Sequence, residues 1–310
     1  MKTVLSIDGG GIRGIIPAKI LEHVERKTRK RTAEMFDLIA GTSTGGILAL
    51  ALAVPDSDDN PAFSADDLAA LYEKRGKDIF YRSSYHCLSS IGGLAEEKYP
   101  HQNLEAVLHE YFAEYLVQHA ITNVMVSAYE IEERSPFFIK SWDGNTWLAR
   151  MRDAARATSA APTFFEPARV HFEADVAAAL IDGGVYVNNP AMSAYAEARR
   201  LWPDERIVVV SLGTGEATRP ITYEEARDWG AVGWIAPLIS VMMHGQAEAA
   251  HYQLRNILRG DFYRIQGRLN IALDDMDNAS ASNILALGEE ARRIAYHHEG
   301  NLAEICALLG

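Results

Sequence analysis

Residues 36–54 read FDLIAGTSTGGILALALAV, and this stretch decides the fold that we expect. Its first five residues have the apolar character of a buried strand, and residues 47–54 have that of a buried helix built from small and apolar side chains. Between them, residues 41–46 contain three glycines, which permit a sharp turn. The same order of strand, tight turn and helix occurs at residues 2–30, so the chain begins with two α/β units.

Two such units in succession predict an α/β fold with a mostly parallel central sheet that is covered by helices on both faces. No stretch of the sequence has the composition of a linker, so we expect a single domain over residues 1–310. After residue 215 the pattern is largely helical. Further strands are predicted at residues 122–130, 136–140, 179–181, 207–212 and 261–265, and further helices at residues 101–116, 147–158 and 191–202.

The composition limits the classes of function. The 310 residues carry a formal net charge of −12 and are 48% hydrophobic, as in an ordinary globular protein. The acidic balance excludes a broad basic surface for nucleic acid, and it argues against electrostatic binding of the whole surface to anionic lipid. The dense basic run at residues 25–31 is best interpreted as the solvated end of the first helix, with a contact to phospholipid as the alternative.

Several features bear on the cellular compartment. The two cysteines, Cys87 and Cys306, are too few for a disulfide framework and are predicted to be free thiols in a reducing environment. The N-terminus has no signal-peptide pattern, and the longest apolar stretches, residues 45–54 and 231–243, are shorter than the roughly 20 residues that span a bilayer. We therefore expect a cytoplasmic protein that is soluble or peripherally associated with membranes.

Residues 77–98 have no regular pattern and contain paired serines and paired glycines. A long loop of this kind inside a compact domain is often a lid or a binding loop, and a plain surface excursion is an equally good interpretation. The helix before this loop is predicted to begin after Ser64, because Asp67 three residues later completes a capping box.

Residues 41–45, GTSTG, match the Gly-x-Ser-x-Gly pattern of a nucleophile elbow. A nucleophile on a turn between strand and helix has a strained backbone, and the flanking glycines remove side chains that would collide with neighbouring elements. The helix that follows directs its positive end toward the nucleophile and toward an oxyanion formed there. Ser43 is therefore the candidate nucleophile, and a serine that merely caps a helix is the alternative.

Residues 8–14, DGGGIRG, form a glycine loop between the first strand and the first helix. A dinucleotide fingerprint fits this position, but it requires an acidic residue at the end of the next strand, where this chain has the serine turn. A Walker loop is excluded because no Gly-Lys-Ser/Thr follows. Consecutive glycines expose backbone N–H groups, so an oxyanion hole is the remaining interpretation. Arg13 could hold a substrate phosphate or form a salt bridge with Asp8 or another local acid.

A serine nucleophile needs a proton acceptor. None of the ten histidines follows a strand on a glycine-flanked loop, as the histidine of a catalytic triad tends to do. Asp182 differs, because it ends the predicted strand at residues 179–181 and precedes Gly183 and Gly184. A carboxylate placed there can face a cleft and accept the serine proton if burial raises its pKa. A structural aspartate that closes an Asx turn is an equally good interpretation.

Taken in order, the motifs at residues 8–14, 41–45 and 182–184 resemble those of the patatin-like phospholipase family, whose catalytic logic is shared with cytosolic phospholipase A2. Residues 157–165, ATSAAPTFF, and residues 188–190, NNP, are similar to further stretches of that family. The resemblance covers about residues 4–215. It implies a three-layer α/β/α fold in which these residues form the catalytic core, with residues 216–310 as a helical extension packed on it.

The resemblance also implies the roles of individual residues. Ser43 and Asp182 would form a catalytic dyad that needs no metal or other cofactor. Glycine stands at position 184, where many relatives have alanine. The implied oxyanion hole consists of Gly9, Gly10 and Gly11, and the implied motif and substrate residues are Arg13, Gly14, Gly41, Gly45, Gly183 and Gly184.

The implied activity is that of a phospholipase A-type lipid acyl hydrolase, which cleaves fatty-acyl esters of phospholipids or related glycerolipids through an acyl-enzyme. The expected partners are the lipid and, transiently, a membrane surface, without nucleic acid. A wall for the acyl chain could come from the apolar stretch at 231–243, for which a buried core helix is the slightly better interpretation. The candidate wall residues are Trp234, Ile235, Leu238 and Ile239.

Three alternatives stay open. The first is an effector phospholipase whose degradation of membranes is switched on by a ligand or by assembly into a homo-oligomer. The second is a catalytically weak protein that binds or stores lipid. The third is a dinucleotide-dependent oxidoreductase, suggested by the glycine loop alone.

Overall fold

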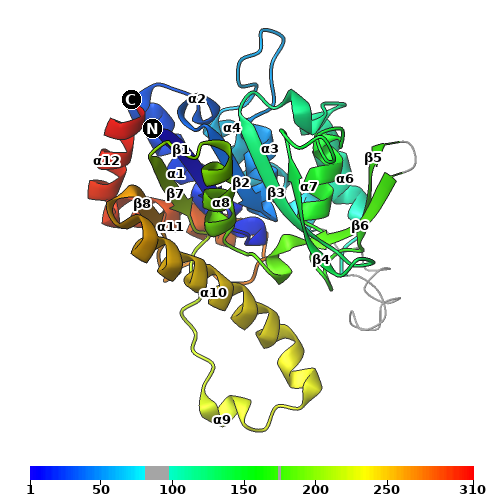
Figure 1. Cartoon of the computed structure of the whole chain (residues 1–310). Helices are drawn as coiled ribbons and strands as arrows, with labels where there is room; N and C mark the ends of the chain where they lie inside the picture. Colours follow the sequence, from blue (N-terminus) through cyan, green and yellow to red (C-terminus); the bar gives the residue numbers. More distant parts are fainter. Residues whose placement is uncertain (81–97, 174–175) are drawn as a thin grey trace.

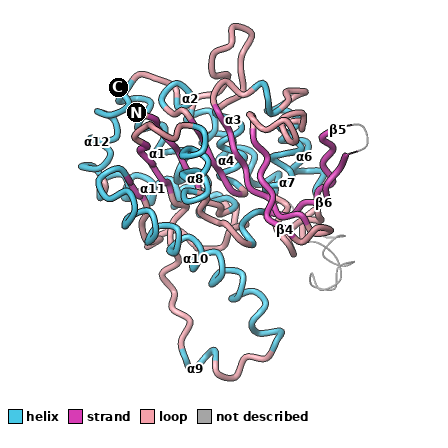
Figure 2. The backbone as a smooth tube through the Cα atoms, viewed as in Figure 1, coloured by secondary structure: helices cyan, strands magenta, loops and turns pink. Residues whose placement is uncertain are grey.

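The computed structural model describes residues 1–80, 98–173 and 176–310, and of residues 231, 232, 235 and 236 it describes the backbone alone. Its centre is an eight-stranded sheet in the order β5-β6-β3-β2-β1-β7-β8, with β4 paired to β3 (Figures 1 and 2). The strands are β1 (Lys2–Ile7), β2 (Leu38–Thr42), β3 (Asn123–Glu130), β4 (Ser135–Lys140), β5 (Ala168–Glu173), β6 (Val176–Asp182), β7 (Ile207–Leu212) and β8 (Phe262–Ile265).

Strand direction brings the sequence motifs to one edge of the sheet. Strands β3, β2, β1, β7 and β8 are parallel, whereas β4 and β6 are antiparallel to β3 and β5 is antiparallel to β6. Ile7 at the end of β1 lies beside Gly41 of β2 and beside Leu212 of β7. Because parallel strands end at the same edge, the segments that follow β1, β2 and β7 meet there. The predicted α/β fold with a mostly parallel sheet is confirmed.

The alternation of side chains along the strands divides the core between the two faces of the sheet. Leu5 and Ile39 belong to a large apolar cluster on one face, and Val4 and Leu38 belong to a smaller cluster on the other. The larger cluster is covered by α1 (Ile15–Thr28), α3 (Thr44–Leu52), α4 (Ala65–Ile79), α6 (His101–Phe112), α7 (Met151–Thr158), α11 (Ala281–His297) and α12 (Glu299–Leu309). The smaller cluster is covered by α8 (Ala191–Leu201) and α10 (Ala231–Leu258), which completes the three layers (Figure 1).

Short helical turns connect these elements. Two of them matter for the site, because η1 continues the glycine loop and η4 follows β6. The short elements are η1 (Gly11–Gly14), α2 (Thr32–Met35), η3 (Val117–His119), η4 (Gly183–Val185), α9 (Tyr223–Ala226) and η5 (Arg259–Asp261).

Several predicted boundaries are wrong. The strand predicted at residues 36–40 is β2, which extends to Thr42 because its last residues pair with β3, and α3 begins at Thr44 rather than at 47. The helix predicted at 101–116 ends at Phe112, because Ala113 has a positive φ of 42°. The helix predicted at 147–158 begins only at Met151.

Two further differences concern strands and loops. β5 was not predicted, because its burial alternates residue by residue and leaves only three apolar side chains facing the core. The irregular stretch predicted at residues 77–98 is helical up to Ile79, the end of α4. Its remainder, with the lid interpretation and Cys87, lies mostly outside the described residues.

Residues 216–310 pack against the sheet and the first helix. β8 extends the sheet beside β7, and α11 and α12 both lie against α1. The first half of α10 and the segment that carries α9 project away from this body (Figure 1). Among the described helices, none combines the length and the apolar character needed to cross a bilayer. The division of a single domain at residue 215 stays a prediction.

Candidate active site

Ser43 occupies the turn between β2 and α3. Its backbone has φ 56° and ψ −126°, a strained conformation for a residue with a side chain. The Ser43 N–H donates to Thr158 Oγ1 at 2.9 Å, and the Ser43 carbonyl accepts hydrogen bonds from the N–H groups of Gly46 and Ile47 at 2.8 and 3.0 Å. These bonds hold the strained turn in place and fix the direction of the serine side chain.

Gly41 and Gly45 lie where one backbone segment passes against another. A Cβ on Gly41 would lie 2.0 Å from the carbonyl oxygen of Gly45, and a Cβ on Gly45 would lie 2.2 Å from the carbonyl oxygen of Ile7. Backbone atoms cannot move aside as a flexible side chain can. Glycine at both positions therefore lets the serine turn pack against the end of β1.

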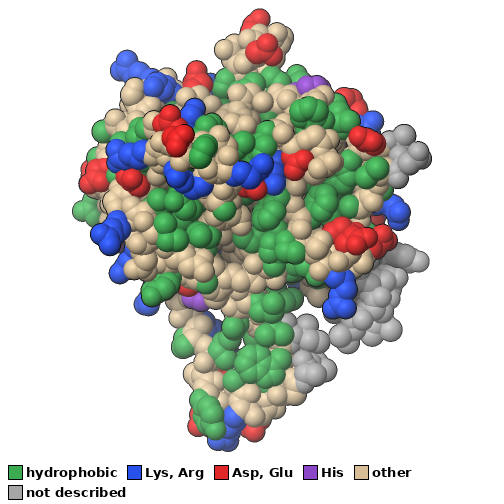
Figure 3. Space-filling model, in the orientation of Figure 1, with side chains coloured by type: hydrophobic (Ala, Val, Ile, Leu, Met, Phe, Trp, Pro, Cys, Tyr) green, Lys and Arg blue, Asp and Glu red, His purple; other side chains and the backbone are tan. Residues whose placement is uncertain are grey.

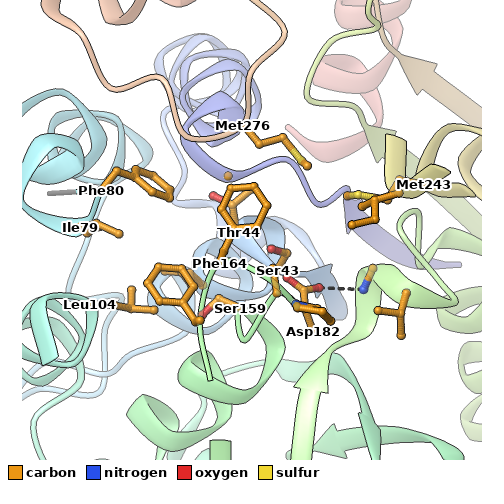
Figure 4. A pocket seen from close by; sticks show the side chains of 18 of the residues that line it. Ser43, Thr44, Ile79, Phe80, Leu104, Ser159, Phe164, Asp182, Met243 and Met276 are labelled. Carbon is orange, nitrogen blue, oxygen red and sulfur yellow. Dashed lines mark hydrogen bonds between the residues drawn. The ribbon is translucent and has the colours of Figure 1, made fainter. Parts of the chain in front are cut away.

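Asp182 is the last residue of β6 and is only 4% exposed. Its Oδ1 accepts a hydrogen bond from the Gly184 N–H at 2.7 Å, and the Ser43 side chain lies beside its carboxylate at the same cavity (Figure 4). Burial raises the pKa of Asp182 to about 7, although the neighbouring Ser43 hydroxyl and the Gly184 N–H act to lower it. A carboxylate with this pKa, placed beside a serine hydroxyl, is suited to exchange a proton with it near neutral pH. The bond to Gly184 is also that of an Asx turn, so the two interpretations of Asp182 are compatible.

The glycine loop lies directly against the serine. A Cβ on Gly9 would be 3.2 Å from the Cβ of Ser43. The Gly9 N–H donates to the Asn188 carbonyl at 3.0 Å, so this donor is engaged within the protein, and its place in the oxyanion hole stays a prediction. In the described part of the chain, the N–H groups of Gly10 and Gly11 have no acceptor. Their role as oxyanion donors stays a prediction.

The other motif glycines also lie against elements of the site. Gly14, at the end of η1, lies against Thr44 of α3, and Gly183 lies against Ser127 of β3. At Gly184 an added Cβ would lie 3.1 Å from Asp182 Oδ1, a tight but less severe contact. The structure thus brings together all three motifs at the edge where β1, β2 and β6 end.

Asp8 has a partner that the sequence did not reveal. Arg264 of β8 forms a buried, bidentate ion pair with it, with Nη1 to Oδ1 at 2.9 Å and Nη2 to Oδ2 at 2.6 Å. Arg264 also donates to Ser211 Oγ at 2.8 Å. The alternative in which Arg13 pairs with Asp8 is therefore wrong. The only available signal was a charged residue inside a predicted apolar strand, which indicates a buried partner.

Arg13 instead ties the glycine loop to the segment that follows β7. Its Nε donates to the Gly10 carbonyl at 3.3 Å and its Nη1 to the Gly215 carbonyl at 3.4 Å. Burial lowers the pKa of Arg13 to about 10, while the neighbouring Asp274 acts to raise it. A contact between Arg13 and a substrate phosphate stays a prediction.

Two more supporting residues come from the last third of the chain. Gln246 of α10 holds the segment after η4, because its Nε2 donates to the Val185 carbonyl at 3.0 Å and its Oε1 accepts from the Asn188 N–H at 3.4 Å. The Met276 carbonyl accepts a hydrogen bond from the Ile12 N–H at 2.8 Å. Neither residue belongs to a motif, so no pattern in the sequence could have found it.

A cavity of about 210 Å³ lies beside Ser43 and Asp182. Its lining is almost entirely apolar. In Figure 4, Ile79, Phe80 and Leu104 lie on one side of Ser43 and Met243 lies on the other. Among the described residues, no three His, Cys, Asp or Glu side chains come together as metal ligands would.

The candidate wall for an acyl chain is only partly correct. Ile239 of α10 lines the cavity, whereas Trp234 and Leu238 are 36% and 46% exposed and do not line it. The side chain of Ile235 lies outside the described residues. A buried core helix is also wrong for this stretch, because the first half of α10 projects from the body.

Comparison with known proteins agrees with the geometry. Residues 5–195 match the profile of a family described as patatin-like phospholipase. The chain belongs to this family. The resemblance found from the three motifs is thereby confirmed.

Two relatives show how far the similarity of this patatin-like protein extends. It is 33% identical to a Solanum tuberosum protein named "Probable inactive patatin-3-Kuras 1", over 93% of this chain and 84% of that protein. It is 30% identical to "Patatin-like protein 2" of Oryza sativa subsp. indica, over 93% of this chain and 83% of that protein. Among solved structures, VipD from Legionella pneumophila is 12% identical, with a TM-score of 0.41 over 96% of this chain and 67% of that one.

Proposed function

We propose that this patatin-like protein is a lipid acyl hydrolase of the phospholipase A type, with Ser43 as nucleophile and Asp182 as general base. The observation that carries the proposal is that the Ser43 side chain lies beside a buried carboxylate, that of Asp182, whose pKa is raised to about 7. The apolar cavity beside this pair supports an acyl chain as the bound group. Membership of the patatin-like phospholipase family supports a lipid ester as the substrate class.

In the first half of the proposed reaction, Ser43 Oγ attacks the ester carbonyl carbon while its proton passes to Asp182. The carbonyl oxygen becomes an oxyanion, to which the N–H groups of Gly10 and Gly11 donate. The bond between the carbonyl carbon and the alcohol oxygen then breaks, and Asp182 gives its proton to the departing alcohol. The product of this half is an acyl ester on Ser43.

In the second half, a water molecule attacks the acyl ester while Asp182 accepts one of its protons. The tetrahedral intermediate collapses, Ser43 Oγ leaves and takes the proton back from Asp182, and the fatty acid is released. Each half uses the carboxylate first as a base and then as an acid, which suits a pKa near the working pH.

The direct test compares fatty-acid release from mixed phosphatidylcholine micelles by the wild type, Ser43→Ala and Asp182→Asn, together with labelling by a fluorophosphonate probe. We expect release to fall by about 10²–10⁴-fold in each variant, and we expect the probe to label the wild type but not Ser43→Ala. Ser282→Ala, a like change on the surface of α11, serves as the control. Release by Ser43→Ala at the wild-type rate would refute the proposal.

The second candidate is a protein that binds lipid with little turnover. The observation that favours it is the word "inactive" in the name of the potato relative. It predicts that the wild type and Ser43→Ala bind phosphatidylcholine equally and release fatty acid equally slowly. Rapid labelling of Ser43 by the fluorophosphonate would exclude it, because labelling requires an activated serine.

A further inference from the structure

Residues 219–243, here called the arm, project from the body of the protein and carry α9 and the first half of α10 (Figure 1). The part of the arm from residue 229 to residue 243 contains no charged residue. A charge-free segment that stands away from the core needs a partner, because large apolar surfaces are seldom left in water.

The arm carries two arginines and three acids, and both arginines form ion pairs with these acids. Arg227 forms ion pairs with Glu224 at 2.6 Å and with Asp228 at 3.2 Å, and Arg219 pairs with Glu225 at 3.3 Å. Both arginines of the arm are thus engaged by its own acids. The arm therefore offers no free basic patch for anionic lipid, and its three acids exceed its arginines by only one charge.

Four exposed apolar side chains of the arm follow one face of α10, and Figure 3 shows hydrophobic side chains gathered on the arm. Trp234, Leu238, Val241 and Met242 have the spacing i, i+4, i+7 and i+8, which places them in one stripe. Their exposed fractions are 36%, 46%, 46% and 45%. This stripe of α10, defined by these four residues, is the surface that a partner would cover.

A pair of tryptophans stands at the start of the stripe. The rings of Trp229 and Trp234 meet edge to face, with their centroids 5.1 Å apart. Tryptophan is favoured where apolar and aqueous phases meet, because its ring is amphipathic. The pair therefore fits the boundary between a lipid layer and water.

The stripe runs into the cavity beside Ser43. Met242 belongs both to the exposed stripe and to the lining of the cavity, and Ile239 and Met243 line the cavity next to it. Whatever covers the stripe consequently lies at the mouth of the cavity. A protein partner, including a second copy of this chain, would close that mouth, whereas a lipid layer would supply acyl chains to it.

We propose that the arm is a docking element that inserts its stripe into the surface of a zwitterionic lipid layer, which has no net charge, and so delivers lipid to the cavity. This proposal rests on the proposed function, because the lipid layer that the stripe binds is the one that contains the substrate of the active site. The charge-free run is shorter than the roughly 20 residues that span a bilayer, so the arm lies in the interface. Because both arginines of the arm are paired and the protein carries a net charge of −12, we expect it to bind such a layer with little dependence on salt.

The test is co-sedimentation of the full-length protein with phosphatidylcholine vesicles. Leu238→Glu/Val241→Glu places two charges on the stripe at residues that do not line the cavity. The control, Tyr252→Glu/Ile257→Glu, makes the same change of charge at two exposed apolar residues in the second half of α10. We expect the stripe variant to bind vesicles at least about tenfold more weakly than the wild type, and the control to bind equally.

Two activities separate this proposal from the one on which it rests. The stripe variant should release fatty acid from vesicles at least about tenfold more slowly, yet hydrolyse a soluble short-chain p-nitrophenyl ester at the wild-type rate. If the wild type hydrolyses neither substrate while vesicle binding depends on the stripe, the hydrolase proposal fails and the docking proposal stands.

Three results would overturn the docking proposal. The stripe variant could bind phosphatidylcholine vesicles as tightly as the wild type. Binding by the wild type could require anionic phosphatidylserine in the vesicles and disappear in high salt. Sedimentation velocity without lipid could also show a wild-type dimer that the stripe variant dissociates while vesicle binding is unchanged, which would make the stripe a contact between two copies.

Discussion

Residues 1–215 and residues 216–310 contribute to the site in different ways. The first part supplies the ends of β1, β2 and β6, where the glycine loop, Ser43 and Asp182 meet. The second part supplies no motif, yet Arg264 holds the start of the glycine loop. Groups that react lie where strands end and leave local patterns, whereas groups that support them need only reach the site after folding. A sequence pattern that identifies the reacting residues therefore does not identify the residues that hold them in position.

The largest effect is expected on the motif side, from Asp182→Asn. Asparagine keeps an oxygen that can accept the hydrogen bond from the Gly184 N–H, but it cannot accept the proton of Ser43. We expect kcat to fall by about 10²–10⁴-fold with little change in KM, measured on a soluble ester. A variant with wild-type kcat would remove Asp182 from the chemistry and leave it as a turn residue.

The same variant should gain stability, since Asp182 is buried at a cost. Its pKa is 3.8 in an ordinary setting and about 7 here, so between these values the folded state holds a proton that the unfolded state has lost. Stability therefore falls as pH rises through this window, and the cost is complete above about pH 7. Urea unfolding should show Asp182→Asn more stable than the wild type at pH 8, by at most about 4 kcal/mol, and equal to it below about pH 4. A variant that is less stable at pH 8 would contradict this.

The next effect tests the other side of the comparison, through Arg264→Met. This change leaves Asp8 buried without its partner, and we expect it to lower the free energy of unfolding by about 3–5 kcal/mol in urea. Asp8→Asn/Arg264→Met should recover much of the loss, because no buried charge remains unpaired.

Arg206→Met provides the matched control for that ion pair. Arg206 pairs with Asp261 immediately before β8, but its side chain is 59% exposed, so we expect a loss of at most about 1 kcal/mol. Equal losses in Arg206→Met and Arg264→Met would show that the last third of the chain supports the glycine loop no more than any surface contact does.

A smaller effect concerns how the two parts share control of the base. The proposed base acts when it is ionised, so kcat/KM on a soluble ester should fall about tenfold per pH unit below about pH 7 and level off above it. Met243→Gln should move the pH below which kcat/KM falls to a lower value. A polar side chain beside the cavity reduces the desolvation that raises the pKa of Asp182. If the same fall of kcat/KM at low pH persists in Asp182→Asn, another titratable group causes it.

The sequence predicts those parts of the fold that carry continuous local patterns. β1 and β7 have the predicted bounds because both are short, mainly apolar runs whose residues, apart from Lys2, are buried on both faces of the sheet. β5 escaped detection because its alternate side chains, including Arg169 and His171, point to solvent. The end of α6 at Phe112 was not predicted, because the residue with positive φ that follows it is Ala113 and not a glycine.

The site divides in the same manner. Ser43 was predicted from its glycine-rich turn between a strand and a helix. The local pattern at Asp182 fitted a structural aspartate equally well, and its proposed role came from the resemblance of the three motifs taken in order. The bond that occupies the Gly9 N–H could not be predicted, because its acceptor, Asn188, is brought there by a different part of the sheet. The projection of the arm could not be predicted either, since an apolar run has the same pattern whether it enters a core or leaves it.

The smallest expected effect concerns acyl-chain-length specificity and tests whether it depends on residues outside the motifs. A second cavity of about 10 Å³ lies between α3, α4 and α6, and Leu104 lines both it and the larger cavity beside Ser43. Leu104→Ala should join the two spaces and shift the preference among p-nitrophenyl esters several-fold toward longer acyl chains.

Leu108→Ala is the matched control, because Leu108 lies one turn further along α6 and lines the smaller cavity alone. Both leucines are 2% exposed, so each change should lower stability by about 2–5 kcal/mol. Only Leu104→Ala opens the partition, and therefore only it should alter the profile of chain lengths. A similar shift in both variants would mean that a loosened core, and not the partition, sets the preference. A shift confined to Leu104→Ala would show that α6, a helix without a motif, selects the chain length. In the same way, the ion pair of Arg264 shows that β8, a strand without a motif, supports the glycine loop.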